Sequence, residues 1–167
     1  MADLFGSHLA QDRETSGVGT GFIGMWKAFD ELQAIGWIDS HRPRMVAVQA
    51  NGCHPIVRAA EAGLDHVPEP WTPVVSQIHG IRVPKPLGDR LILAVIKASD
   101  GFGSKASDAS AEAARREVIE KEGVHLAPEG ALCYAAYRAD LASGRVRPSD
   151  HVILLNTATG LKSALSR

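Results

Sequence analysis

The chain has 167 residues, of which 45% are apolar and 22% are charged, a balance typical of one globular domain with its own core. The 18 Lys and Arg against 19 Asp and Glu leave a formal net charge of −1, which argues against general electrostatic capture of nucleic acid or of an anionic membrane. The longest purely apolar run, residues 91–96, is too short to span a membrane.

The N-terminus carries an acid at position 3 and no apolar stretch of the kind that a secretory signal contains. Cys53 and Cys133 stand far apart and form no CxxC pattern, so we interpret both as reduced, free thiols. Together these features predict a cytoplasmic location.

Residues 1–15 are interpreted as a polar tail, because residues 1–16 show neither a helical nor a strand period. The glycine-rich stretch SGVGTGFIG follows. Residues 25–35 repeat apolar side chains at steps of three and four, which predicts an amphipathic helix that ends at Gly36.

The run MVAVQA at 45–50 predicts a buried strand, and Pro55 is expected to open a short helix that ends near Gly63. Residues 64–86 contain five prolines. They are therefore expected to form a long irregular loop, of a length that is uncommon unless the loop is functional or wraps another part of the protein.

Residues 87–99 favour a helix, with a strand as the competing interpretation. Further helices are predicted at 109–122, with Ser107 or Asp108 as the cap, and at 130–142, and a second clear strand is predicted at 151–156. Alternating strands and helices predict an α/β fold, a parallel sheet flanked by helices. Two clear strands make a thin sheet, and the expected strand before the glycine loop is missing from residues 1–16.

Four glycines of the loop lie directly before a helix, at positions 17, 19, 21 and 24. Backbone N–H groups of such a loop and the helix N-terminus form a cradle for an anion, so phosphate binding is the favoured interpretation. A turn that merely permits tight packing is the alternative. Residues 19–24 also match GxGxxG, but no acid follows the next strand to hold a ribose, so a dinucleotide module is a weaker hypothesis.

Four segments in order resemble the C-terminal half of threonine synthase, a fold type II pyridoxal-phosphate enzyme of the tryptophan synthase β-like superfamily. They are SGVGTGFIGMWKAFDELQAIGWI, RPRMVAVQANGCHPIVRAAEAG, APEGAL and LLNTATGLKSAL. The resemblance implies that residues 16–167 form a single α/β cofactor-phosphate-binding half domain, part of the large domain of such an enzyme. It also implies pyridoxal 5′-phosphate as the cofactor.

The resemblance assigns cofactor-binding roles to two segments. The phosphate is expected on backbone N–H groups of Gly17, Val18, Gly19, Thr20 and Gly21, with Phe22 and Ile23 as further donors. The Thr157 hydroxyl is expected to meet the pyridine nitrogen. Val18 and Ala158 depart from the family pattern, which has glycine at both places.

No catalytic residue is assigned, because the family's Schiff-base lysine lies in its N-terminal half. None of the six lysines stands in the family's lysine motif; they are at 27, 85, 97, 105, 121 and 162. The stretch around Lys105 is expected to be a loop and short strand. The chain is therefore expected to be a C-terminal fragment that is inactive alone.

The expected function is that of a threonine synthase-like lyase in threonine biosynthesis, which converts O-phosphohomoserine and water to threonine and phosphate. The alternatives are a fragment related to threonine dehydratase or cysteate synthase, and a non-catalytic remnant that binds pyridoxal phosphate or another phosphorylated metabolite. The expected partners are an amino-acid phosphate and either a second copy of the chain or the missing N-terminal half.

Three other candidates carry less weight. The seven histidines show no HxH or HxxxH spacing, so no zinc site is predicted. Adjacent side chains point apart, which disfavours a Cys53–His54 dyad. Glu129 is interpreted as structural, capping a helix or ordering the loop behind the cofactor.

Overall fold

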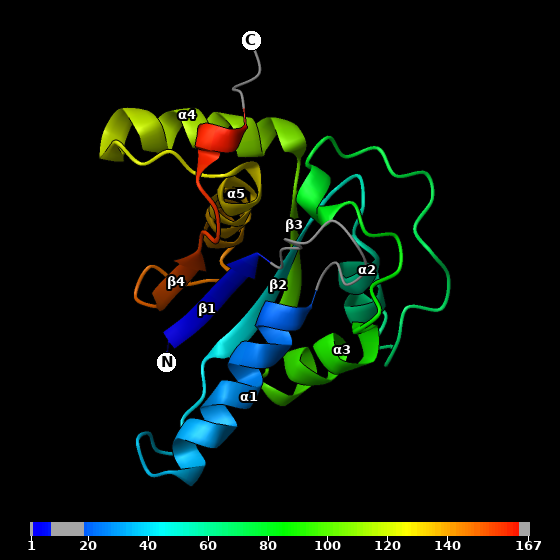
Figure 1. Ribbon diagram of the computed structural model, residues 1–167, viewed down its shortest axis with the longest axis vertical. Helices are drawn as coiled ribbons and strands as arrows, with labels where there is room; N and C mark the ends of the chain where they lie inside the picture. Colours follow the sequence, from blue (N-terminus) through cyan, green and yellow to red (C-terminus); the bar gives the residue numbers. More distant parts are fainter. Residues whose placement is uncertain (1, 8–18, 164–167) are drawn as a thin grey trace.

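A computed structural model describes residues 2–7 and 19–163 of the chain. Four parallel strands form one sheet in the order β3-β2-β1-β4 (Figure 1). They are β1 (Ala2–Ser7), β2 (Arg44–Ala50), β3 (Phe102–Ala106) and β4 (His151–Leu155). The predicted α/β class, with a parallel sheet flanked by helices, is thereby confirmed.

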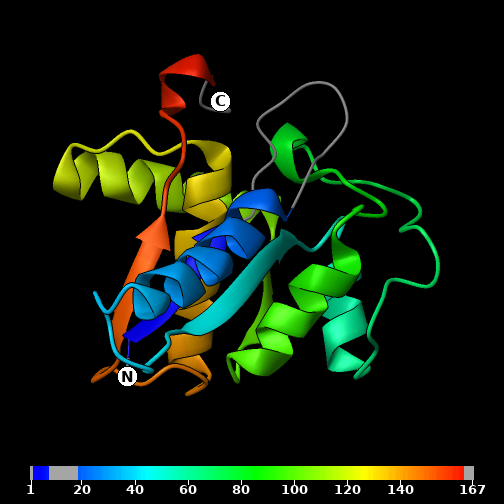
Figure 2. The same ribbon diagram turned by 60° about the horizontal axis from the view of Figure 1, so that its bottom comes forward.

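Helices cover both faces of this sheet. They are α1 (Thr20–Ala34), α2 (Pro55–Glu61), α3 (Asp89–Ala98), α4 (Asp108–Glu122) and α5 (Pro128–Ala142), with short 3-10 turns η1 (His79–Ile81) and η2 (Gly160–Lys162). The first three helices lie on one face, whereas α4 and α5 lie on the other (Figures 1 and 2). Among the described residues, no helix combines the length and the apolarity that crossing a membrane requires.

Strand β2 organises two separate cores because its side chains alternate between the faces. Val46 and Val48 belong to the cluster that contains α4 and α5 residues. Met45 and Ala47 belong to the cluster with α1, α2 and α3. Buried Gln49 uses its Oε1 to accept the N–H groups of Ile56 and Val57, at 2.9 and 3.1 Å, and so satisfies the start of α2.

The expectation that residues 1–16 contain no strand is wrong, because β1 occupies Ala2–Ser7. Its neighbours explain the difference. β1 pairs with β2 on one side and with β4 on the other, so its backbone gains hydrogen bonds from both directions. Such pairing can override a weak local preference. The sheet has four strands, and the glycine-rich stretch follows one of them.

The predicted helices are present, with shifted ends. α1 starts at Thr20, before the predicted 25–35 segment, and Gly36 follows its end with a φ of 76°. The 87–99 stretch is the helix α3, because its buried side chains fall on one face while Leu91 and Lys97 are exposed. The Ser107 side chain caps α4 by accepting the N–H of Ser110. The 64–86 segment is irregular apart from η1.

One buried carboxyl group gives this fold a pH dependence. Asp140 on α5 is 5% exposed, and the Ser104 hydroxyl of β3 donates to it. Burial raises the pKa of Asp140 above its ordinary value of 3.8, although hydrogen bonding from Ser104 and the charge of Arg145 act in the opposite direction. The folded state therefore retains this proton to a higher pH than the unfolded state.

We expect the Asp140 contribution to stability to be complete below about pH 4 and to be lost as the pH rises through the folded pKa. Asp140→Asn keeps an acceptor for Ser104 and removes the titration. Urea unfolding of both proteins across the acidic and neutral range should show the wild type losing stability relative to the variant as pH rises. The opposite slope would mean that the ion pair with Arg145 outweighs burial.

Candidate functional site

The carboxyl ends of parallel strands share one edge of a sheet, where ligands of open α/β folds bind. β1 and β4 are neighbours in this sheet, with Gly6 opposite Leu155 (Figure 1). The chain leaves β1 at this edge and enters α1 at Thr20. Thr157 lies two residues beyond the end of β4. Both segments predicted to bind the cofactor therefore follow neighbouring strands of the sheet. In the sequence, 137 positions separate Thr20 from Thr157.

The N-terminus of α1 is built around Gly19. This residue has a φ of 127°, and a Cβ there would lie 2.6 Å from the Ile92 Cδ1 atom, so only glycine fits without strain. No described side chain caps the helix, and its first turn contains no acid. Thr20 and Gly21 are exposed, and their N–H groups precede the first helical hydrogen bonds. This end of α1 presents positive electrostatic potential to an anion.

The structure limits the predicted donor set. The Ile23 N–H already donates to the Gly19 carbonyl at 2.8 Å, so the prediction that it is a further phosphate donor is wrong. Phe22 is buried in the core on the α1 face of the sheet. Gly17 and Val18 lie outside the described residues, so their assignment stays a prediction.

An isolated antiparallel β-bridge holds the segment that follows β4. Leu126 and Thr159 form a bridge, and the Gly160 N–H donates to the His125 carbonyl at 2.8 Å. Asn156 Oδ1 accepts the N–H of Ala127 at 3.3 Å. The segment that carries Thr157 is thus held at both ends against the loop before α5, while Thr157 itself stays exposed.

Buried Arg115 of α4 reinforces this arrangement. It is 2% exposed, and its Nε donates to the Leu126 carbonyl at 3.3 Å. One Nη donates to the Ser163 carbonyl at 2.8 Å, and another lies 3.0 Å from the Glu112 carboxylate. A single guanidinium therefore contacts two segments, residues 125–127 and residues 156–163. We call these two segments together the bracket.

Carboxylates at the starts of α4 and α5 hold the neighbouring loop. Glu129 Oε1 accepts the Gly80 N–H at 3.1 Å, and Asp108 accepts from the Ser76 hydroxyl at 2.9 Å and from the Gln77 N–H. Glu129 therefore orders a loop, one of the two structural roles that the sequence suggested. A mixed-charge hollow of ≈ 370 Å³ lies between these groups, and Lys162 reaches its rim.

The Cys53–His54 pair has no geometry for nucleophilic chemistry. His54 Nδ1 lies 2.9 Å from the Asn51 carbonyl, and the imidazole packs on Trp71 with ring centroids 3.9 Å apart. Burial raises the pKa of the Cys53 thiol and lowers the pKa of His54. Cys53 and Cys133 form no disulfide with each other, and both are buried, which the sequence analysis did not predict. Among residues 2–7 and 19–163, no three His, Cys, Asp or Glu side chains group as a metal site requires.

Comparison with known proteins defines the class to which this chain belongs. The chain belongs to the pyridoxal-phosphate dependent enzyme family, whose pattern matches residues 15–158. Over 139 residues it is 28% identical to threonine synthase from Methanocaldococcus jannaschii and 29% identical to threonine synthase from Methanosarcina acetivorans. Each match covers 83% of this chain and 34% of the relative, so the chain spans about a third of their length.

The fold agrees with this membership. The processed form of threonine deaminase isoform 2 from Solanum lycopersicum superposes with a TM-score of 0.68 at 12% identity, covering 95% of this chain and 38% of that chain. The resemblance to fold type II pyridoxal-phosphate enzymes is thus confirmed, and pyridoxal 5′-phosphate is the cofactor of this class.

The described residues fit this cofactor. The start of α1 offers the N–H groups of exposed Thr20 and Gly21, with neither a side-chain cap nor an acid in the first turn among the described residues. These features suit a phosphate. Thr157 offers a neutral hydroxyl at the adjacent strand end, which suits a pyridine nitrogen.

Sequence reasoning missed the residues that hold Thr157 in place. Asn156 and Arg115 act through contacts with residues distant in the sequence. Two glycines mark the close approach: a Cβ on Gly130 would lie 2.1 Å from Asn156 Oδ1, and a Cβ on Gly160 would lie 2.2 Å from the Leu126 carbonyl oxygen. β1 supplies the strand that a dinucleotide motif requires, but β2 is followed by Asn51 rather than by an acid.

Proposed function

We propose that this chain is the cofactor-phosphate-binding half of a threonine synthase-like lyase, which acts on O-phosphohomoserine and water to form threonine and phosphate. The observation that carries the proposal is that the α1 N-terminus and Thr157 follow the neighbouring parallel strands β1 and β4, at the same edge of the sheet. The 28–29% identity to threonine synthases favours this reaction over those of other family members.

In this proposal, N–H groups from Gly17 to Gly21 hold the phosphate, and the Thr157 hydroxyl orients the ring through its nitrogen. When bound, pyridoxal phosphate supplies a ring that withdraws electrons from the substrate carbon. A hydroxyl partner, unlike a carboxylate, does not force protonation of the ring nitrogen. Thr157 therefore sets the strength of this withdrawal.

We further propose that the 167 residues alone bind the cofactor without turning over substrate. Three of the six lysines support this, since Lys27 and Lys121 form ion pairs within exposed helix faces and Lys105 lies 3.4 Å from Glu61. A lysine nucleophile needs a lowered pKa and a desolvated setting. The isolated chain is expected to release no phosphate from O-phosphohomoserine.

Cofactor binding tests this function directly. We expect ³¹P NMR to show pyridoxal phosphate binding to the chain, and Gly19→Ala to weaken it by about tenfold, because the positive φ and the Ile92 contact displace the start of α1. Gly24→Ala is the matched control, since its Cβ would meet nothing within 4 Å. Equal affinity in both variants, or binding of pyridoxal without phosphate at the same strength, would contradict the proposed phosphate site.

A further inference from the structure

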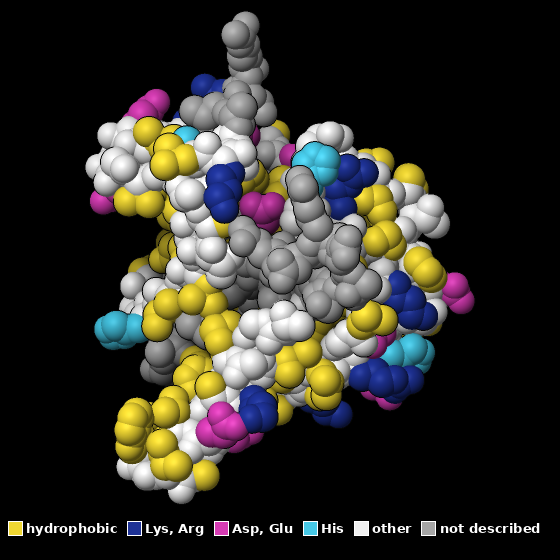
Figure 3. Space-filling model, in the orientation of Figure 1, with side chains coloured by type: hydrophobic (Ala, Val, Ile, Leu, Met, Phe, Trp, Pro, Cys, Tyr) yellow, Lys and Arg dark blue, Asp and Glu magenta, His cyan; other side chains and the backbone are white. Residues whose placement is uncertain are grey.

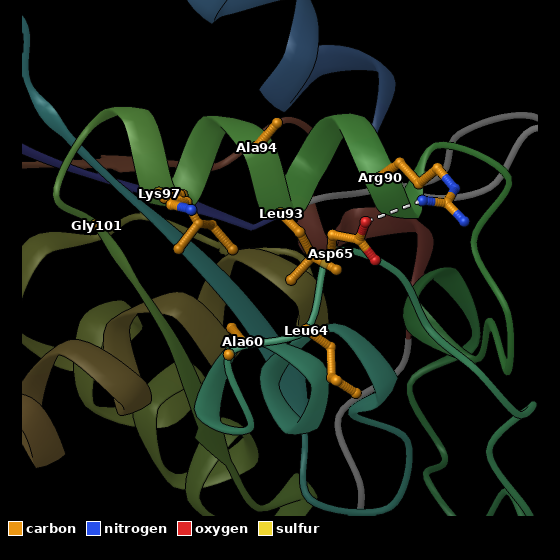
Figure 4. Close-up of a pocket in the computed structure, with 10 residues that line it drawn as sticks. Ala60, Leu64, Asp65, Arg90, Leu93, Ala94, Lys97 and Gly101 are labelled. Atoms are coloured by element: carbon orange, nitrogen blue, oxygen red, sulfur yellow. Dashed lines mark hydrogen bonds and ion pairs between the residues drawn. The ribbon is translucent and has the colours of Figure 1, made fainter.

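A separate groove lies between α2 and α3, on the face of the sheet that α1 also covers (Figure 4). Its volume is ≈ 580 Å³, within the range of small-molecule sites. The groove reaches Gly101, which directly precedes β3 and therefore lies at the amino edge of the sheet. The candidate cofactor site lies at the opposite, carboxyl edge, so the two sites are distinct.

Small residues create the hollow and apolar ones line it. Ala60 lies in the last turn of α2, Gly63 follows that helix, and Ala94 comes from the exposed face of α3. The larger apolar residues of the lining are Leu64 and Leu93, of which Leu93 is a buried member of the core (Figure 4). Leu64 is 41% exposed. A hydrocarbon that occupied the groove would remove this surface from water.

The two ends of the groove differ in charge. At one end, Arg90 Nη1 lies 3.2 Å from the Asp65 carboxylate, which neutralises it (Figure 4). At the other end is Lys97, to which the described residues offer no carboxylate partner. Arg90 and Lys97 are seven residues apart on α3, so they share one side of the helix at a separation of roughly 10 Å. The groove therefore has an apolar floor with one uncompensated positive charge.

We propose that this groove binds a small amphiphilic carboxylate, such as an alkanoate the length of octanoate. The carboxylate pairs with the Lys97 ammonium, and the hydrocarbon chain lies along Leu93 and Leu64 toward the Asp65–Arg90 pair. Charge selects the head group, since an amine would meet Lys97 with like charge and an alcohol would leave it unpaired. This site is independent of the cofactor.

Titration of the ¹⁵N-labelled chain with octanoate tests the site. The amide signals of Gly63 and Gly101 are expected to shift together, with octanol binding more weakly and octylamine not at all. Lys97→Met should weaken octanoate binding by about threefold or more, the effect of a partly exposed ion pair, without changing octanol binding. Lys121→Met, on α4, is the matched control. Octanol binding as strong as that of octanoate, or an unchanged affinity in Lys97→Met, would overturn the proposal.

A second pair of variants tests the position. Ala94→Phe adds a ring at the exposed rim of the groove, beside its opening, and should reduce octanoate affinity. Ala98→Phe places the same ring one turn further along the same side of α3, where Ala98 does not line the groove, and should leave octanoate affinity unchanged. Both side chains point to solvent, so both variants are expected to fold. Retained binding in Ala94→Phe, or shifts confined to signals elsewhere, would exclude this groove.

Discussion

Arg115→Met is expected to lower the free energy of unfolding by about 3 kcal/mol, because it removes a buried cation whose partners stay behind. The Leu126 and Ser163 carbonyls would each lose a donor, and Glu112 would lose an ion pair. Methionine fills a similar volume, so little of the loss comes from a cavity. Urea unfolding monitored by circular dichroism measures the difference.

Arg116→Met is the matched control for this prediction. Arg116 is the next residue on α4, and its side chain is 48% exposed and lies 3.5 Å from the same Glu112 carboxylate. A surface pair of this kind contributes little, so the control should stay within about 0.5 kcal/mol of the wild type. Equal losses in both variants would show that Arg115 stabilises the fold through the positive charge that it places on α4, and not through its contacts with the bracket.

Gly160→Ala is expected to cost about 3 kcal/mol of folding free energy. An added Cβ would lie 2.2 Å from the Leu126 carbonyl oxygen and 2.6 Å from the His125 ring, and the carbonyl belongs to the backbone and cannot rotate away. The bracket must therefore open on one side. Thermal unfolding of the variant should show a lower midpoint.

Gly24→Ala provides the contrast, because the same change in the exposed middle of α1 meets nothing within 4 Å and should stabilise the helix by up to about 1 kcal/mol. If Thr157 contacts the cofactor ring, Gly160→Ala should also change the absorption of bound pyridoxal phosphate while Gly24→Ala does not. A Gly160→Ala protein as stable as the wild type would show that the 125–127 loop can move aside with no loss of folding free energy.

Helices were the most predictable part of the fold. The 109–122 helix has local signals at both ends, Ser107 as its cap and Gly123 in the left-handed conformation. Buried β2 was predictable because a run of apolar residues within a sheet covered on both faces needs no alternation. The resemblance to a pyridoxal-phosphate enzyme could be found from the sequence because its motifs are short stretches of neighbouring residues.

The strand β1 shows what local sequence could not decide. Its residues carry no period, and the strand exists because β2 and β4 both pair with it. The same holds for the bracket, since Arg115 stands in no motif and the contact of Asn156 with Ala127 joins residues far apart in the chain. Contacts of this kind depend on packing, which a pattern of nearby residues does not contain.

The sequence by itself determined which groups are available to bind a cofactor, namely the glycine-rich start of a helix and a threonine after the last strand. It also determined the family to which both features belong. Only the tertiary structure decided that these two segments follow neighbouring strands at one edge of the sheet and that a buried arginine holds one of them in place. The physical reason is that local propensity acts over a few residues, whereas strand order and burial are settled by the whole chain at once.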